Sequence, residues 1–222
     1  MQLIFNHKSN LTYNEIIKYE KKLRKYNVIV LPTTCYLSLF KKGKYILGSQ
    51  DISEFEEKNR TGEINGEQLK SLNVEYVLIG HTERRQYNLE TEKTIKNKLE
   101  RAISSNITPL YCVGEKNNIG EVNEQIDLYF NNVVKEKNYI VYEPVNNIGK
   151  KNIDIETIKR NIKYIKDYSK ETYNKNIKLI YGGGVNLKNI KELSKINEID
   201  GLILSKDALE INNIDKLYKM AN

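Results

Sequence analysis

The strongest constraint in this sequence is a regular alternation of short apolar runs with longer segments of helical period. The apolar runs are nearly continuous, which is typical of parallel strands that are covered on both faces. The segments between them repeat apolar residues at steps of three and four, as in Ile95, Leu99 and Ala102. The eight runs are Leu3–Phe5, Val28–Leu31, Tyr45–Leu47, Tyr76–Ile79, Leu110–Val113, Tyr139–Tyr142, Leu179–Tyr181 and Leu202–Leu204.

This order of elements predicts the α/β class with a parallel sheet. Eight strand and helix units are the number that closes into a (β/α)8 barrel, so we expect a single barrel domain over residues 1–222. An open, doubly wound sheet is the alternative arrangement. No linker rich in Pro, Gly or Ser and no low-complexity segment divides the chain.

Composition argues against several classes of partner and location. The first apolar stretch is too short for a signal peptide, and no run approaches the roughly 18 apolar residues of a membrane span. The formal charge is +7, but the lysines are spread along the chain among Glu and Asn, as on solvated helix faces. We therefore expect neither a nucleic acid nor a membrane as partner. Cys35 and Cys112 lie in apolar contexts, which predicts buried, reduced thiols in a cytoplasmic protein.

Candidate chemistry stands directly after the apolar runs. Barrel active sites lie at the C-terminal ends of the strands. Asn6 and Lys8 follow the first run, His81 and Glu83 follow the fourth, and Glu143 follows the sixth. A single strand-end Glu is more often a solvated cap, and a single Lys is more often a surface residue. A lysine, a histidine and a carboxylate at three strand ends instead indicate one shared pocket. No histidine has metal-ligand spacing, so we expect no metal.

The stretch VLIGHTERRQY, residues 77–87, joins a buried strand to a cluster of charge. A helix that begins at Thr82 would place the positive end of its dipole beside His81. This favours a neutral imidazole that donates a hydrogen bond. We expect Arg84 and Arg85 to pair with carboxylates beneath the site and to serve as scaffold.

Two motifs are specific enough to indicate a family. GHTERRQY, residues 80–87, and YEPVNNIGK, residues 142–150, resemble the signature and the catalytic stretch of triosephosphate isomerases. FNHKSN, RTGEI, YCVGE, YGGGVN and DGLIL are similar to further segments of that family, in the same order and at similar spacing. The resemblance covers nearly the whole chain and implies a (β/α)8 TIM barrel.

The resemblance also implies a reaction and the residues that perform it. It implies interconversion of dihydroxyacetone phosphate and D-glyceraldehyde 3-phosphate through an enediolate, in glycolysis and gluconeogenesis and without a cofactor. Glu143 would be the base that moves the proton, and His81 would polarise the carbonyl group. Lys8 and Asn6 would stabilise the enediolate oxygen, and Glu83 would hold Lys8.

The phosphate end departs from the family pattern. The resemblance assigns phosphate binding to Gly149, Gly184, Ser205 and Lys206. Gly184 stands where the family has Ser, and Ser205-Lys206 replaces a Gly-Gly pair. Ser205 is a favourable N-cap residue, so we expect a short helix to begin there. Asp207 would oppose a bound dianion unless it points away or pairs with Lys206.

The lid that follows the sixth run departs as well. Asn146 stands where the family has Trp, and one residue is missing between Gly149 and Lys151. These changes leave two alternatives to a triosephosphate isomerase. One is a related isomerase of another small phosphosugar, such as a tetrulose phosphate, and the other is a non-catalytic barrel that binds a metabolite.

The connection between the third and fourth runs predicts how the protein assembles. Its stretch Gln50–Glu63 is long and polar, and long loops in compact domains tend to be functional. In the resembling family this loop inserts into a neighbouring subunit. We therefore expect a homodimer, with Thr61 close to the active site of the partner.

Overall fold

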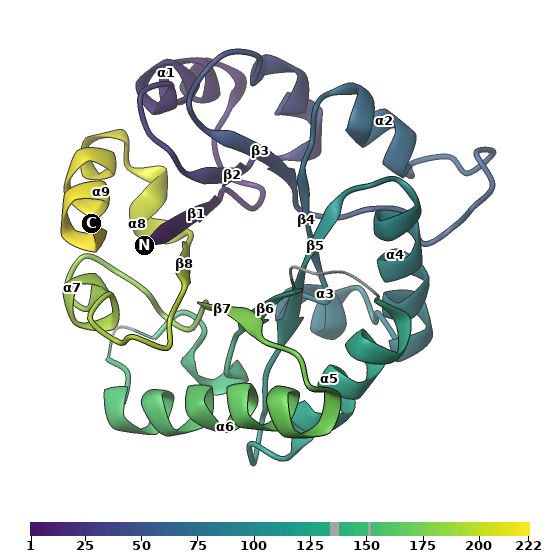
Figure 1. Cartoon of the computed structure of the whole chain (residues 1–222). Helices are drawn as coiled ribbons and strands as arrows, with labels where there is room; N and C mark the ends of the chain where they lie inside the picture. Colours follow the sequence, from purple (N-terminus) through teal and green to yellow (C-terminus); the bar gives the residue numbers. More distant parts are fainter. Residues whose placement is uncertain (134–137, 151) are drawn as a thin grey trace.

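A computed structural model describes residues 1–133, 138–150 and 152–222 of the chain. Its centre is a closed barrel of eight parallel strands, in which each strand pairs with the next and β8 returns to β1 (Figure 1). The closure confirms the predicted barrel and excludes the open sheet. The strands are β1 Gln2–Asn6, β2 Ile29–Leu31, β3 Ile46–Ser49, β4 Tyr76–Ile79, β5 Thr108–Val113, β6 Asn138–Tyr142, β7 Ile177–Tyr181 and β8 Gly201–Leu204.

The strands are mostly apolar because both faces of the barrel wall are largely buried. Along β1, Ile4 joins the cluster that fills the barrel, whereas Leu3 and Phe5 join the cluster between the sheet and the helices. Successive side chains of a strand point to opposite faces, so each apolar run supplies both clusters. The interior cluster consists of Ile4, Ile29, Leu31, Leu78, Leu110, Cys112, Val141, Ile180 and Ile203.

Helices surround the barrel in a ring (Figure 1). Several begin at capping residues that the sequence supplies, such as Thr12 with Glu15 before α1, and Asp154 before α6. After β2 the helix is reduced to the 3₁₀ segment η1, Thr34–Leu39. The α-helices are α1 Tyr13–Leu23, α2 Gly66–Ser71, α3 Thr82–Tyr87, α4 Glu92–Ser104, α5 Glu121–Asn132, α6 Ile155–Tyr173, α7 Ile190–Leu193, α8 Lys206–Leu209 and α9 Ile214–Ala221; the other 3₁₀ segments are η2 Val145–Asn147 and η3 Ile211–Asn213. Among the described residues, no helix is long and apolar enough to cross a membrane.

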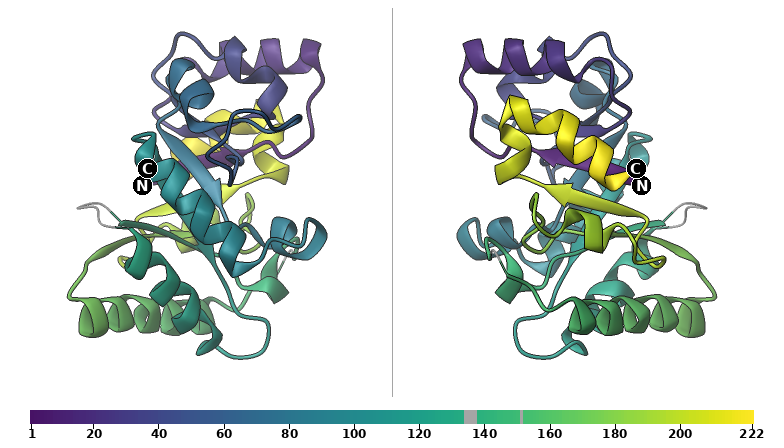
Figure 2. Two further views of the ribbon diagram at one scale, coloured as in Figure 1. Left: turned by 90° about the vertical axis from the view of Figure 1, so that its right-hand side faces the viewer. Right: turned by 90° about the vertical axis from the view of Figure 1, so that its left-hand side faces the viewer.

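The seam between β8 and β1 brings the two ends of the described chain together. The Met1 ammonium donates a hydrogen bond of 2.9 Å to Oδ1 of Asn222, and Figure 2 shows the two ends side by side. Beside the seam, Lys22 of α1 forms an ion pair with Asp215 of α9. The first and last helices therefore brace the same part of the barrel.

The cysteines differ from the sequence prediction. Cys112 is buried as predicted, but Cys35 is exposed, so the prediction for Cys35 was wrong. Cys35 lies in η1, where the buried position is taken by Leu37. A segment with one apolar face turns its other residues to solvent, and apolar neighbours in sequence do not reveal which face that is.

His7 lies in the core, between Asn6 and Lys8 in sequence, and it is fully buried. Its ring meets that of Tyr19 edge to face, at 4.6 Å between centroids, and it also lies near Phe40. Neither ring nitrogen has a hydrogen-bond partner among the described residues. Burial lowers the pKa of His7 from 6.5 to about 3, because nothing compensates the charged form.

This burial makes a testable contribution to acid sensitivity. Below pH 6.5 the unfolded chain takes up a proton at His7, whereas the folded chain resists protonation until about pH 3. The contribution of His7 to the free energy of unfolding is therefore fully present above pH 6.5. It is lost as the pH falls below that value, by about 1.4 kcal/mol per pH unit. We expect the free energy of unfolding, measured with urea, to decline less steeply between pH 6 and pH 4 in His7→Phe than in the wild type. Parallel pH profiles of the two proteins would contradict this.

Candidate active site

The C-terminal ends of the strands open into a cavity of about 460 Å³. Eight of the nine predicted site residues line it, and the ninth, Glu83, contacts Lys8. The structure thus brings the whole predicted set together. The cavity is lined by Asn6, Lys8, His81, Glu143, Ile148, Gly149, Lys150, Gly182, Gly184, Val185, Asn186, Leu187, Lys188, Ile203, Leu204, Ser205, Lys206 and Asp207.

His81 and Glu143 face each other in this cavity. Nε2 of His81 lies 3.4 Å from Oε1 of Glu143, and both residues are almost completely buried. His81 is the N-cap of α3, and its Nδ1 accepts a hydrogen bond of 3.2 Å from the backbone N–H of Glu83. A ring nitrogen that accepts carries no proton, so the neutral ring holds its proton on Nε2. The helix start thereby directs a hydrogen-bond donor at the cavity, as the sequence predicts.

Lys8 is fixed at the end of β1 by several contacts. Its backbone is left-handed, with φ 51°, and its N–H donates to Oδ1 of Asn6 at 3.0 Å. Thr33 and Gln50 donate to its carbonyl oxygen, at 2.8 and 2.9 Å. Its ammonium group pairs with Glu83. The predicted contact between Glu83 and Lys8 is thus present, and it joins the ends of β1 and β4.

The two arginines after His81 pair with carboxylates next to the site, as predicted. Arg85 donates from Nε to the carbonyl oxygen of Gly80 at 2.9 Å and pairs with Glu92 at 2.5 Å. Gly80 has φ 73°, a left-handed conformation that suits glycine. Arg85 therefore stabilises the turn that carries His81.

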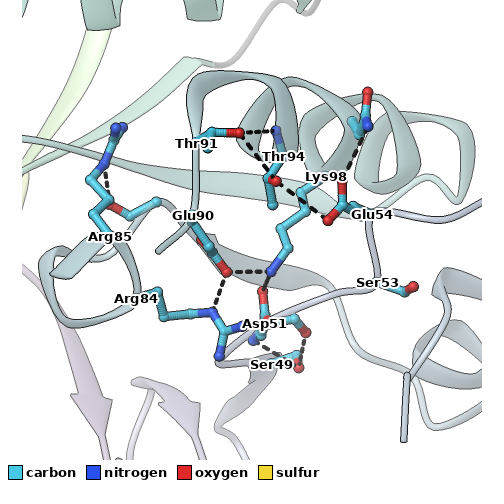
Figure 3. Close-up of polar contacts among 12 residues, drawn as sticks. Ser49, Asp51, Ser53, Glu54, Arg84, Arg85, Glu90, Thr91, Thr94 and Lys98 are labelled. Atoms are coloured by element: carbon cyan, nitrogen blue, oxygen red, sulfur yellow. Dashed lines mark hydrogen bonds and ion pairs between the residues drawn. The ribbon is translucent and has the colours of Figure 1, made fainter. Parts of the chain in front are cut away.

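Arg84 belongs to a partly buried ion cluster, which Figure 3 shows between α3, α4 and the loop after β3. Arg84 and Lys98 both contact Asp51 and Glu90, with Lys98 at 2.6 Å from Asp51. Burial raises the pKa of Asp51, with Lys98 opposing the rise. Burial also acts on Glu90, but bonds from Lys98 and Arg84 outweigh it and lower the pKa of that carboxyl. The cluster fixes the start of the long loop to the helix that His81 caps.

Two residues that touch Glu143 were not predicted as part of the site. Burial, together with the nearby Glu143 carboxylate, raises the pKa of the Cys112 thiol well above its usual range. Gly182 leaves room for the same side chain, since a Cβ atom there would lie 2.9 Å from Cγ of Glu143. The YGGG stretch could have indicated close approach at Gly182, whereas only the fold places Cys112.

Gly184 shows why a serine would not fit at its position. It is left-handed, with φ 65°, and a Cβ atom would lie 2.6 Å from the carbonyl oxygen of Lys150 and 2.8 Å from that of Asn147. The segment after β6 thus packs directly on Gly184. The N–H of Gly184 has no acceptor among the described residues. The one-residue deletion that the sequence indicates between Gly149 and Lys151 reaches Lys151, which lies outside the described residues.

The turn after β8 leads into a short helix as predicted. Ser205 is the N-cap residue of α8, and its hydroxyl makes no capping bond within the described structure. Its backbone, at φ −122° and ψ −81°, lies outside the extended range that capping residues usually adopt. Lys206 is exposed at the rim of the cavity, together with Lys150 and Lys188. Asp207 does not pair with Lys206, because its Oδ2 accepts from the N–H of Leu187 at 2.8 Å.

Comparison with known proteins identifies the family. The family model described as triosephosphate isomerase matches residues 1–221. The chain belongs to the triosephosphate isomerase family. Proteins named triosephosphate isomerase that are similar to it include one from Mesomycoplasma hyorhinis, 36% identical over 185 residues that cover 80% of this chain and 74% of the relative. One from Clostridium botulinum (strain Langeland) is 34% identical over 230 residues, which cover 92% of this chain and 93% of the relative.

The candidate residues of this member of the triosephosphate isomerase family lie together at the C-terminal end of the barrel. The described residues contain no group of three His, Cys, Asp or Glu side chains that could hold a metal ion. His81, the buried Glu143 and Lys8 line this cavity together.

The space at Gly182 provides a test of how Glu143 is positioned. A methyl group at Gly182 would lie 2.7 Å from Cγ2 of Ile203 and 2.9 Å from Cγ of Glu143, so both side chains would have to shift and Gly182→Ala is expected to lower kcat about tenfold to a hundredfold. Gly201→Ala is the matched control, because its Cβ atom would lie 2.9 Å from the carbonyl oxygen of Gln2, at the opposite end of the barrel. It should lower the unfolding midpoint while kcat is kept. Equal kcat values for the two variants would show that Gly182 does not position the base.

Proposed function

We propose that this chain is a triosephosphate isomerase that interconverts dihydroxyacetone phosphate and D-glyceraldehyde 3-phosphate. One barrel over residues 1–222 would form the catalytic domain. The observation that carries the proposal is the pairing of His81 Nε2 with Glu143 Oε1, 3.4 Å apart in a cavity that Lys8 also lines. The names of the relatives support the same substrate and give no support to a tetrulose phosphate or to a non-catalytic barrel.

Glu143 is suited to remove a proton from carbon. Its side chain is buried, and Oε2 accepts no hydrogen bond from the described residues. Glu143 would take the proton from C1 of the ketose and return it at C2, which moves the double bond through an enediolate.

His81, Lys8 and Asn6 are suited to stabilise that enediolate. Nε2–H of His81 would donate to the oxygen that gains negative charge, without becoming charged itself. The Lys8 ammonium, held by Glu83, would supply positive charge beside the same oxygen. Asn6 is almost fully buried and keeps the backbone of Lys8 in place. Donors that are held before the reaction need no rearrangement when charge develops.

The phosphate group would lie at the other end of the cavity. Gly149, Gly184, Ser205 and Lys206 line that end, where their backbone N–H groups would bind the phosphate, and the N–H of Gly184 has no acceptor among the described residues. The exposed ammonium of Lys206 would add positive charge at a position where the resembling family has glycine. This arrangement supports binding of a dianion by backbone groups, with lysines at the rim.

The decisive experiment follows turnover of D-glyceraldehyde 3-phosphate in a coupled assay, beside a panel of tetrose and pentose phosphates. Turnover confined to the triose phosphate is expected. In D₂O, deuterium should enter the carbon-bound positions, because the proton passes through an exchangeable carboxyl group. A preference for a tetrose phosphate, or no turnover of any sugar phosphate, would overturn the proposal.

Shortening the base is expected to slow the reaction. Glu143→Asp withdraws the carboxylate by roughly 1 Å and should lower kcat about a hundredfold, with a small change in KM. Glu192→Asp in α7 makes the same chemical change outside the cavity and should leave both parameters unchanged. An unaltered kcat in Glu143→Asp would mean that another group removes the proton.

We also propose that the protein is a cytoplasmic homodimer joined through the loop Gln50–Glu63. Figure 1 shows this connection extending outside the ring of helices beside α2. Its base is fixed by the ion cluster at Asp51, whereas residues 56–63 are exposed. Such a loop is well placed to enter a second copy of the barrel. The exposed, reduced thiol of Cys35 favours a reducing compartment.

Sedimentation tests this assembly. At micromolar concentration the protein is expected to sediment at twice the 25.9 kDa of one chain. Thr61→Arg places a long charged side chain in the proposed contact and should shift the protein toward the monomer. Thr172→Arg, at an exposed position of α6, is the matched control. A wild-type protein that sediments as a monomer would contradict the proposal.

A further inference from the structure

Two walls of the phosphate end of the cavity come from different segments. One is the loop after β7, which contains Gly184, and the other is the turn Ser205–Lys206 after β8. A dianion that is bound by backbone groups from both walls needs them at a fixed separation. The contact that sets the distance between the two walls therefore affects how tightly the site binds phosphate.

The loop after β7 is cross-linked by its own hydrogen bonds. Asn189 accepts at Oδ1 from the N–H of Asn186 at 2.8 Å, and the side-chain amides of both residues donate to the carbonyl oxygen of Gly184, at 2.9 and 3.0 Å. Asn186 in turn accepts at Oδ1 from the N–H of Lys188 at 2.9 Å. Gly184 and Leu187 consequently belong to one hydrogen-bonded unit.

The short helix α8 is held to the outer elements of the barrel. Tyr19 of α1, which is buried, donates from its hydroxyl to the carbonyl oxygen of Ala208. Asn213 donates from Nδ2 to the carbonyl oxygen of Asp207 at 3.2 Å. These bonds fix the backbone from which the Asp207 side chain extends.

Asp207 connects the two units. Its Oδ2 accepts a hydrogen bond of 2.8 Å from the N–H of Leu187, and both residues line the cavity. No ion pair within the described structure neutralises this carboxylate. Asp207 thus brings a negative charge to the end of the cavity where the proposed function places a dianion.

We propose that Asp207 is a positioning residue that sets the affinity for the anionic end of the substrate. Its hydrogen bond holds the loop that contains Gly184 against the Ser205–Lys206 turn, which favours binding. Its charge opposes the bound dianion and offsets the attraction of the lysines at the rim, which keeps the anion from binding too tightly for release. This inference rests on the proposed function, because that function supplies the dianion.

Two substitutions separate the hydrogen bond from the charge. Asp207→Asn can still accept from Leu187 through Oδ1 but carries no charge, whereas Asp207→Ala has neither. With inorganic phosphate as the probe in calorimetric titration at low salt, Asp207→Asn is expected to bind about twofold to fivefold more tightly than the wild type. This gain should shrink at high salt. Asp207→Ala is expected to bind about threefold to tenfold more weakly than Asp207→Asn.

Two further measurements distinguish positioning from general stability. The KM for the triose phosphate should follow the phosphate affinities while kcat changes little, and Lys206→Ala should change KM in the direction opposite to Asp207→Asn. Amide exchange at Leu187 should stay slow in Asp207→Asn and become faster in Asp207→Ala.

The outcomes are distinguishable from failure of the proposed function. The phosphate titration and the Leu187 exchange do not require turnover, so they report on Asp207 even if the triose phosphate proves not to be the substrate. The inference is overturned if Asp207→Asn binds phosphate no more tightly than the wild type does at low salt. The same holds if the two Asp207 variants bind equally, or if the wild type binds no phosphate.

Discussion

The pairing of β8 with β1 is the contact on which the rest of the structure depends. It turns a row of parallel strands into a ring, so that every strand end opens on the same space. Lys8 after β1 and Lys206 after β8 become neighbours of one cavity, although nearly the whole sequence separates them. His81 and Glu143 reach that cavity from β4 and β6. Without the closure, these residues would lie along the edge of an open sheet.

Each reactive group in the cavity is held by a neighbour that takes no part in the proposed chemistry. The start of α3 fixes the tautomer of His81, and Glu83 holds Lys8. Gly182 supplies space for Glu143, and Arg85 stabilises the turn before His81. A site assembled from single strand ends needs such supports, because each strand contributes only one or two side chains.

Most of the fold, and which candidate residues lie together in one cavity, could be predicted from the sequence, because both follow local rules. Apolar runs predict strands, strand ends predict the site, and His81 before a helix start predicts a neutral donor. The remaining features depend on contacts between distant segments. The bond from Leu187 to Asp207, the approach of Lys150 to Gly184 and the exposed face that carries Cys35 leave no local pattern.

The position of the seam in the order of synthesis has a consequence for the nascent chain. β1 is made first and gains β2 early, but its other edge has no partner until β8 leaves the ribosome. During nearly all of translation the growing sheet therefore presents an unpaired apolar strand, and such edges promote aggregation. The residues that line the cavity come from both sides of this seam, with Lys8 after β1 and Lys206 after β8, so ligand binding must wait for β8. A ligand that bridges the seam would thus favour completed chains over truncated ones.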